Sequence, residues 1–262
     1  MTYTHYDTPV VRIPFMIETL TQPVVFAHRG TSAYAPENTM AAFQLALDQG
    51  ARAIEFDVKL SADGHVVIIH DQTVDRTTNA TGNVASLPLD VLRALDAGSW
   101  FGAAFHGEKI PTLHEVFAAF GENVLMNIEL TNYHTPFDAL VPKVVDLIQK
   151  YGVARNIWFS SFYPHNLIRT ARLLPSVPRG QLIWPGPAGA WQRIWDRSIN
   201  LQAEHPWKDE ITAASVQAAH QRGRRVHAWT VNSPDDLRRL KSIGVDGIFT
   251  DDPKMALEIV NR

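Results

Sequence analysis

Residues 54–71 read IEFDVKLSADGHVVIIHD, in which two β-type runs flank the dipeptide Asp63-Gly64. An Asp-Gly pair favours a two-residue hairpin turn, because both central residues of that turn take positive φ. With Asp63 and Gly64 as the turn pair, Asp57 lies opposite His70, and opposed Cβ atoms are about 5 Å apart. The stretch therefore predicts a β-hairpin that brings a carboxylate and an imidazole together.

The first run of this hairpin carries more charge than a buried strand usually does. Side chains alternate along a strand, so Glu55, Asp57 and Lys59 share one face, while Phe56 and Val58 point to the other. One explanation is that Glu55 and Asp57 lie on a hairpin face exposed to solvent. Because the flanking residues are apolar, we favour a buried site, in which like charges require a cation or hydrogen-bond donors.

The composition is that of an ordinary globular chain, with 262 residues of which 45% are hydrophobic and 19% charged. No Pro/Gly/Ser-rich linker interrupts the chain, so residues 1–262 are expected to form a single domain. The formal net charge of -3 provides no electrostatic basis for binding nucleic acid or anionic membranes. The absence of cysteine excludes thiolate chemistry and leaves oxygen or imidazole ligands for any metal.

The amino-terminal region does not resemble a targeting segment. Residues 1–23 include Asp7 and Glu18 and lack the long apolar core of a secretory signal. No run in the chain approaches the roughly 20 apolar residues that span a bilayer. We therefore expect a cytoplasmic protein with no stable membrane association.

Strand and helix patterns alternate along the chain. The expected strands cover 24–27, 54–60, 124–130, 156–160, 180–184, 199–204, 225–231 and 246–250. The expected helices lie between 39 and 50, near 113–120, 137–150, 165–174, 189–196, 209–222 and 234–242, and from 253 onward. The run 66–69 is excluded from the parallel set, because the short link after Leu60 cannot make a parallel crossover. Eight strand–helix units in about 250 residues predict an α/β fold, a (β/α)₈ TIM barrel.

Two additions to this barrel are expected. The hairpin contributes an extra strand, and residues 72–111 form a small irregular insertion after the second strand. Loops of that length in a compact domain are commonly functional. An open doubly wound sheet is the alternative fold, but the segment 28–33, HRGTSA, lacks the glycines of a nucleotide-binding turn.

The active site of such a barrel lies at the carboxyl ends of its strands. Residues at the expected strand ends include His28, Arg29, Glu55, Asp57, Asn127, Glu129, Ser160, Ser161, Trp184, Glu204, His205, Trp229, Thr250, Asp251 and Asp252. Glu55, Asp57 and Glu129 offer three oxygen ligands from adjacent strands, and hard ligands of this kind favour Mg²⁺ or Ca²⁺ over Zn²⁺. The pattern predicts a site for one divalent cation at this rim.

Two histidines and an arginine complete the predicted site. His28 and His70 can act as general base and acid, since imidazole titrates near neutral pH. Arg29 offers a planar guanidinium suited to a phosphate or carboxylate. A cation, two imidazoles and a guanidinium together suit phosphoryl transfer, so the residues predict an enzyme that acts on a phosphoester.

Seven motifs, in order within residues 24–255, resemble those of the glycerophosphodiester phosphodiesterases. They are His28-Arg29-Gly30, Ala35-Pro36-Glu37-Asn38-Thr39, Glu55-Phe56-Asp57-Val58, Asp63-Gly64, His70-Asp71, Asn127-Ile128-Glu129-Leu130 and Trp229-Thr230-Val231-Asn232. Residues 76–79 (RTTN) and 96–100 (DAGSW) are similar to the insertion of the cytoplasmic bacterial members. A single motif is weak, whereas seven at coherent spacing are specific.

The resemblance implies a barrel, a divalent cation, and hydrolysis of a glycerophosphodiester to sn-glycerol 3-phosphate and an alcohol. By matching motif, it assigns acid/base catalysis to His28 and His70, metal binding to Glu55, Asp57 and Glu129, and phosphate binding to Arg29. It also implies attack by the glycerol 2-hydroxyl, which gives a cyclic phosphate that water then opens.

One position departs from the family pattern. The family usually has a lysine two residues after the glutamate equivalent to Glu129, and this chain has Thr131 there. Threonine cannot supply the positive charge expected near the phosphate. Lys59, on the same strand face as Asp57, is our candidate for part of that charge and is predicted to bind substrate.

Two of the residues at the expected strand ends are tryptophans. Trp229 is predicted to form the floor of the glycerol pocket, with a core tryptophan as the alternative, whereas Trp184 is expected to pack in a rigid loop over the rim.

A related phosphodiesterase, either lysophospholipase D-like or releasing a cyclic phosphate, is the second candidate function. An inactive barrel retained for binding is the third, favoured by Thr131 and opposed by the intact histidines and acids.

Overall fold

A computed structural model of the chain describes residues 16–192 and 199–262. In this part of the chain, eight parallel strands close into a barrel, because β1 pairs with both β9 and β2. The barrel strands are β1 (Val24–His28), β2 (Ala53–Leu60), β4 (Leu125–Leu130), β5 (Ile157–Ser161), β6 (Arg179–Ile183), β7 (Ala203–Pro206), β8 (Arg225–Ala228) and β9 (Gly247–Thr250). The predicted (β/α)₈ TIM barrel is confirmed.

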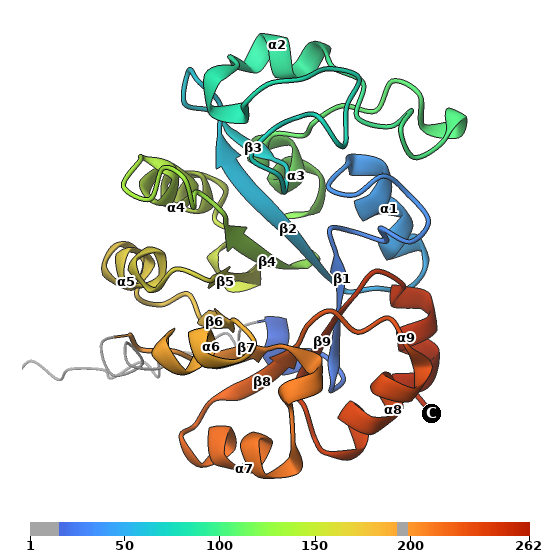
Figure 1. Cartoon of the computed structure of the whole chain (residues 1–262), viewed down its shortest axis with the longest axis vertical. Helices are drawn as coiled ribbons and strands as arrows, with labels where there is room; N and C mark the ends of the chain where they lie inside the picture. Colours follow the sequence, from blue (N-terminus) through green and yellow to red (C-terminus); the bar gives the residue numbers. More distant parts are fainter. Residues whose placement is uncertain (1–15, 193–198) are drawn as a thin grey trace, which may run out of the picture.

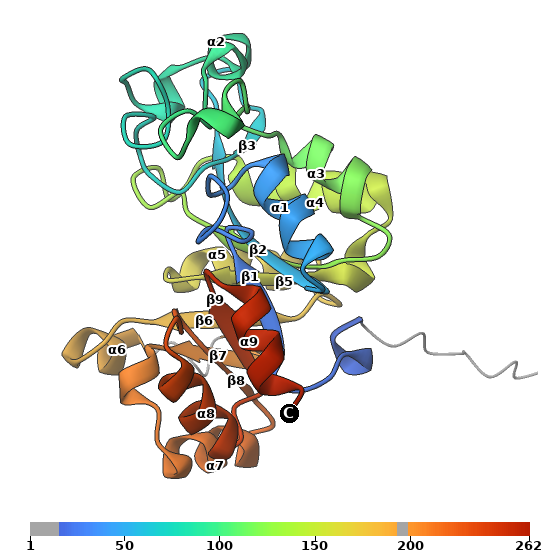
Figure 2. The ribbon, with the colours of Figure 1, turned by 90° about the vertical axis from the view of Figure 1, so that its right-hand side faces the viewer.

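Helices follow the barrel strands and surround them in chain order (Figures 1 and 2). They are α1 (Met40–Asp48), α3 (Leu113–Phe120), α4 (Leu140–Tyr151), α5 (Pro164–Leu173), α6 (Pro187–Gln192), α7 (Ala213–Gln221), α8 (Pro234–Ser242) and α9 (Pro253–Val260). Short 3₁₀ helices are η1 (Met16–Thr19), η2 (Val84–Ser86), η3 (Ala103–Phe105), η4 (Ala154–Asn156) and η6 (Lys208–Glu210). None of the helices in the described ranges is long and apolar enough to cross a membrane.

The expected and observed elements differ most near residue 200. The strand expected over 199–204 begins only at Ala203, and residues 193–196 of the helix expected over 189–196 lie outside the described residues. Ile199 and Leu201 are buried and apolar, which made them resemble strand residues. They pack against the barrel's main hydrophobic core as a connecting segment, without joining the ladder.

The hairpin forms, but the predicted two-residue turn is wrong. The second strand, β3 (Val66–Ile68), pairs antiparallel with β2 in a register that places Val58 opposite Ile68. Five residues connect the strands, because the Ser61 N–H donates to the His65 carbonyl across a wider loop. Asp57 therefore lies opposite Ile69, whose N–H donates to the Asp57 carbonyl, and not opposite His70.

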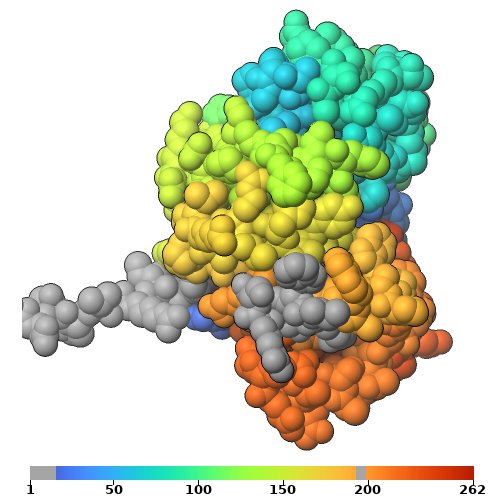
Figure 3. Space-filling model, turned by 60° about the vertical axis from the view of Figure 1, so that its left-hand side comes forward, coloured from blue at the N-terminus to red at the C-terminus, as the bar shows by residue number. Residues whose placement is uncertain are grey.

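Residues 72–111 lie beyond the ring of helices, at the end of the molecule that Figures 2 and 3 place uppermost. The segment is mostly irregular and contains one short helix, α2 (Leu89–Ala94). It packs on β3 through a separate hydrophobic cluster of Val67, Ile69, Val74, Val84, Leu92, Ala97 and Ile110. This cluster holds the segment against the carboxyl end of β2, where the functional residues were predicted.

Two buried histidines occupy the barrel interior below that end. The Nε2 atom of His205 lies 3.1 Å from Nδ1 of His227. Burial lowers the pKa of His205 to about 3 and that of His227 well below its usual value, so both rings are neutral. The neighbouring strands β6 and β9 provide room for the rings, because a Cβ at Gly180 would overlap the His205 imidazole and one at Gly247 would lie 2.7 Å from Cδ2 of His227.

Gly180→Ala is expected to lower the free energy of unfolding by about 1–3 kcal/mol, since the added methyl overpacks a filled interior. Urea unfolding of the metal-free protein measures this change. Gly102→Ala serves as the control, because no heavy atom lies within 4 Å of a Cβ added at Gly102. A Gly180→Ala protein as stable as the Gly102→Ala protein would contradict the close packing of the His205 ring against Gly180.

Candidate active site

A cavity of about 320 Å³ opens at the carboxyl ends of the barrel strands. Its lining residues are His28, Arg29, Glu55, His70, Asn127, Glu129, Ser160, Phe162, Leu182, Trp184, Trp229, Thr230 and Phe249. A larger hollow lies at the opposite end of the barrel, beside β1 and α9, and contains none of the predicted site residues. The cavity at the carboxyl ends therefore brings together most of the residues that the sequence singled out.

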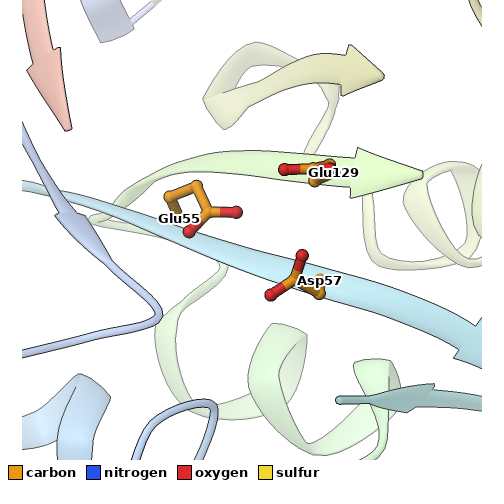
Figure 4. Close-up of side chains that lie close together, drawn as sticks. All are labelled: Glu55, Asp57 and Glu129. Carbon is orange, nitrogen blue, oxygen red and sulfur yellow. The ribbon is translucent and has the colours of Figure 1, made fainter. Parts of the chain in front are cut away.

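Three carboxylates converge beside this cavity (Figure 4). Glu55 and Asp57 come from β2 and Glu129 from β4, and one carboxylate oxygen of each lies within 4.8 Å of the other two. The register of the two strands explains this convergence, because it places Asp57 directly opposite Glu129. Among the residues that the structure describes, this is the cluster of acids and histidines close enough to share a metal ion.

The charges of these carboxylates are poorly compensated by the protein itself. Burial and the charges of Asp57 and Glu129 raise the pKa of Glu55 well above its usual value. Burial and the charge of Asp57 raise the pKa of Glu129 to about 7. The Oε1 atom of Glu55 is buried and accepts no hydrogen bond. Three acids with an unpartnered oxygen fit a hard divalent cation, which would neutralise them and occupy that oxygen.

Asp57 differs from the other two acids because cations and a donor surround it. Burial acts to raise its pKa, but the charges of His70 and Arg29 and a hydrogen bond from Asn38 lower it below the usual value. Asn38 Nδ2 donates to Asp57 Oδ2 over 2.9 Å. Asn38 has a φ of 58°, a left-handed conformation that asparagine tolerates better than most residues.

Each of the two predicted catalytic histidines is oriented by a carboxylate. Nδ1 of His28 lies 2.7 Å from Asp251 Oδ1, and Nδ1 of His70 lies 2.6 Å from Asp71 Oδ1. A carboxylate at Nδ1 selects the tautomer and leaves Nε2 as the reactive nitrogen. The Nε2 atom of His28 lies 4.0 Å from Glu55 Oε2. Both rings line the cavity, so both have access to a bound ester.

Arg29 lies in a strained turn between these groups. Its φ is 56°, and its backbone N–H donates to Glu55 Oε2 over 3.0 Å. Its Nη1 donates to Glu37 Oε1 over 2.9 Å, and its Nε lies 3.5 Å from Asp57 Oδ2. Burial opposes its charge, but the charges of Asp57, Glu37 and Glu55 raise its pKa, so the guanidinium stays protonated at the cavity wall.

Comparison with known families agrees with this geometry. Residues 28–255 match the model of the glycerophosphoryl diester phosphodiesterase family. The chain belongs to this family. Membership makes the protein an enzyme, a phosphodiesterase, and the matched range spans the positions of the predicted site residues.

Several relatives of this phosphodiesterase have similar chains over nearly their whole length. The glycerophosphodiester phosphodiesterase of Caldanaerobacter subterraneus is 38% identical over 242 residues, which cover 91% of this chain and 98% of that protein. The glycerophosphodiester phosphodiesterase of Bacillus subtilis is 31% identical over 87% of this chain and 83% of its own. A phosphodiesterase of Oleispira antarctica, solved in complex with the product sn-glycerol-3-phosphate, has a TM-score of 0.81 and 32% identity over 91% of this chain and 96% of its own.

In this phosphodiesterase, Lys59 lies apart from the cavity. Its Nζ donates to the carbonyl and the Oγ1 of Thr131, over 2.7 and 2.9 Å, and the two residues line a separate small hollow. Burial lowers the pKa of Lys59, opposed by the charges of Asp57 and Glu129. Its ammonium therefore acts on the acids through space, and its predicted contact with substrate stays a prediction.

One side of the phosphodiesterase cavity is apolar and aromatic. Trp184 stacks on Phe162, with ring centroids 3.9 Å apart and planes 21° from parallel, and Trp229 meets Phe162 edge-on at 5.4 Å. Trp229 lines the cavity, as expected of a residue that floors a substrate pocket, and its Nε1 donates to the His205 carbonyl. Trp184 packs as predicted, is 42% exposed, and also lines the cavity.

Two further residues of the site, Phe162 and Tyr133, were not predicted from the sequence. Phe162 follows β5 and forms the centre of the aromatic side of the cavity. Tyr133 donates its hydroxyl proton to Glu129 Oε1 over 2.6 Å. Burial and the charge of Glu129 raise the pKa of Tyr133 well above its usual value, so the phenol remains a donor. Both residues lie in loops that follow barrel strands, which is the position where a barrel carries its functional side chains.

Proposed function

We propose that this phosphodiesterase hydrolyses glycerophosphodiesters to sn-glycerol 3-phosphate and an alcohol, with one divalent cation. One observation supports the proposal above others: three carboxylates within 4.8 Å of one another lie beside a cavity lined by two carboxylate-paired histidines and an arginine. A relative with 32% identity contains sn-glycerol-3-phosphate, the product of the proposed reaction.

Glu55, Asp57 and Glu129 are the proposed metal ligands, and Mg²⁺ or Ca²⁺ suits their oxygens. A cation bound there would supply charge stabilisation for the anionic phosphate oxygens. Arg29 is proposed to bind another phosphate oxygen with its guanidinium, which lines the same cavity.

His28 and His70 are proposed to move the protons. One neutral imidazole accepts the proton of the glycerol 2-hydroxyl as its oxygen attacks phosphorus, and the other, protonated, donates to the departing alcohol. This step yields a cyclic phosphate. Water then attacks phosphorus, loses a proton to the second imidazole, and the first imidazole protonates the 2-oxygen as the ring opens. The two rings end in their starting protonation states.

The test is release of glycerol 3-phosphate from a panel of glycerophosphodiesters that bear choline, ethanolamine, inositol or glycerol. With Mg²⁺ or Ca²⁺ present, we expect release from at least one member, and chelator is expected to abolish it, because the protein itself leaves the charges of Glu55 and Glu129 poorly compensated. Adding the cation back after chelation restores activity and controls for damage. Absence of metal-dependent release from every member would contradict the proposal and favour the inactive barrel.

The aromatic side of the cavity favours one other substrate class as a second candidate. Phe162, Leu182 and Trp184 present apolar surface that suits the acyl chain of a lysophospholipid. Lysophosphatidylcholine is therefore added to the panel as a separate arm. Faster release of choline from it than from glycerophosphocholine would favour the lysophospholipase D-like function, and an accumulating cyclic phosphate would favour the cyclic-phosphate-releasing enzyme.

A further inference from the structure

Arg76, in the 72–111 segment, joins two carboxylates with both edges of its guanidinium. Nε and Nη2 donate to Asp71 over 2.7 and 3.1 Å. Nη1 and Nη2 donate to Glu37 over 2.7 and 2.8 Å. Each carboxylate is thus held by a bidentate pair, the arrangement that fixes geometry most strongly and that lysine cannot reproduce.

Both carboxylates continue to residues that line the cavity. Asp71 Oδ1 lies 2.6 Å from Nδ1 of His70, and Glu37 Oε1 accepts from Nη1 of Arg29 over 2.9 Å. Arg76 itself is not among the residues that line the cavity. One guanidinium therefore closes a continuous chain of charged hydrogen bonds between the proposed proton-transfer group and the proposed phosphate-binding group.

We propose that Arg76 is a positioning residue for the reaction: it orients His70 through Asp71 and Arg29 through Glu37, and so sets their relative position across the cavity. This inference rests on the proposed function. It gives the 72–111 segment a role in catalysis, because Arg76 of this segment joins Glu37, which lies 39 positions away in sequence, to Asp71, which lies 5 positions away.

A purely structural role for the ion pairs is the competing explanation. The Arg76 side chain is 44% exposed, and ion pairs at that exposure contribute about 0–1 kcal/mol to stability. The segment is already held to the barrel by its own hydrophobic cluster. Glu37 and Asp71 would, in contrast, lose their common partner without Arg76, and two carboxylates freed in this way can turn away from His70 and Arg29.

The experiment compares Arg76→Gln, Arg76→Lys and Arg76→Ala with the unmodified protein on the best substrate of the panel. Arg76→Gln is expected to lower kcat/KM by about 10–100-fold, the usual effect of losing a residue that orients a reactive group. The loss is expected in both kcat, through His70, and KM, through Arg29. Arg76→Lys is expected to recover only part of it, and added guanidinium ion to recover part of the activity of Arg76→Ala.

Arg93→Gln is the matched control, because Arg93 lies in the same segment and forms an ion pair of 2.6 Å with Glu115, away from the cavity. It is expected to keep the kcat and KM of the unmodified protein, and every variant to keep its thermal midpoint within a few degrees. Unchanged kinetics of Arg76→Gln in an active protein would overturn the inference, as would a loss matched by Arg93→Gln.

A second readout does not depend on turnover. The ¹⁵N signals of the His70 ring report its tautomer, which Asp71 selects at Nδ1. Arg76→Gln is expected to convert one tautomer into a mixture, and Arg93→Gln to leave it unchanged. An unchanged His70 tautomer in Arg76→Gln overturns the inference. Failure of the proposed function is distinguishable, because it appears as absence of turnover by the unmodified protein.

Discussion

His28→Asn and His70→Asn are each expected to lower kcat by about 10²–10⁴-fold, the range that general acid–base catalysis contributes. Asparagine places a side-chain amide near the position of Nδ1, so it can still donate to Asp251 or Asp71, which hold the native rings. The substitution removes Nε2, the nitrogen that faces the reaction. Initial rates of glycerol 3-phosphate release, at saturating substrate and cation, measure the effect.

A substrate with a better leaving group separates the two roles. A glycerophosphodiester of p-nitrophenol does not need its departing oxygen protonated, so in the first turnover one of the two variants is expected to release p-nitrophenol at most of the unmodified rate and the other to stay slow. His65→Asn is the control, because His65 is exposed in the hairpin loop, with 55% of its side chain accessible. Near-normal rates in both His28→Asn and His70→Asn would remove the imidazoles from the mechanism.

The convergence of the acids could be predicted because it follows from strand geometry alone. The carboxyl ends of parallel strands meet at one rim, and alternation fixes which residues point inward. The ladder between β2 and β4 then makes Asp57 and Glu129 neighbours. A correct order of strands was therefore enough to predict that the three acids converge, even though the hairpin register was wrong by one residue.

The hairpin register was predicted wrongly because the turn preference of Asp63-Gly64 does not account for the side-chain hydrogen bonds of Ser61. Asp63-Gly64 has the composition of a two-residue turn, and Gly64 has the expected positive φ of 80°. Ser61 nevertheless widens the loop, since its Oγ donates to Asp63 Oδ1 and accepts from the His65 N–H. His70 still reaches the cavity, because it lies just beyond the end of β3 and lines the site from there.

The partners that orient the site could not be predicted, because they are brought together by loops. Arg76 meets Glu37 across 39 positions of sequence, and Asp251 meets His28 across 223. No periodicity links such residues, and in the sequence an acidic residue or an arginine in a loop cannot be distinguished from an ordinary surface residue. Predicting these contacts needs the path of each loop in space, which hydrophobic patterns do not specify.

Glu129→Gln is expected to have opposite effects on stability with and without cation. In the metal-free protein, burial and Asp57 raise the pKa of Glu129 to about 7 from 4.5. Between these values the folded state keeps a proton that the unfolded state has lost, so stability falls as pH rises from 4.5 to 7. A full shift corresponds to about 3 kcal/mol; since Glu129 is only half-buried, we expect about 1–2 kcal/mol.

Glutamine does not ionise, so in chelator the Glu129→Gln protein is expected to be the more stable one at pH 8, with little difference at pH 4.5. Saturating Mg²⁺ or Ca²⁺ reverses the order, because binding stabilises the unmodified protein by about 3 kcal/mol at a hundred times the dissociation constant and the variant by much less. The variant is also expected to lose about 10²–10³-fold in kcat.

Thermal and urea unfolding at both pH values, with chelator and with cation, give the four comparisons needed. Glu258→Gln is the control, since Glu258 is an exposed residue of α9 and its loss leaves the three acids intact. The reversal is specific to a cation site, because a carboxylate that only stabilised the fold would make the variant weaker under every condition. An unmodified protein that gains no stability from either cation, at any pH, would contradict the assignment of Glu129 as a ligand.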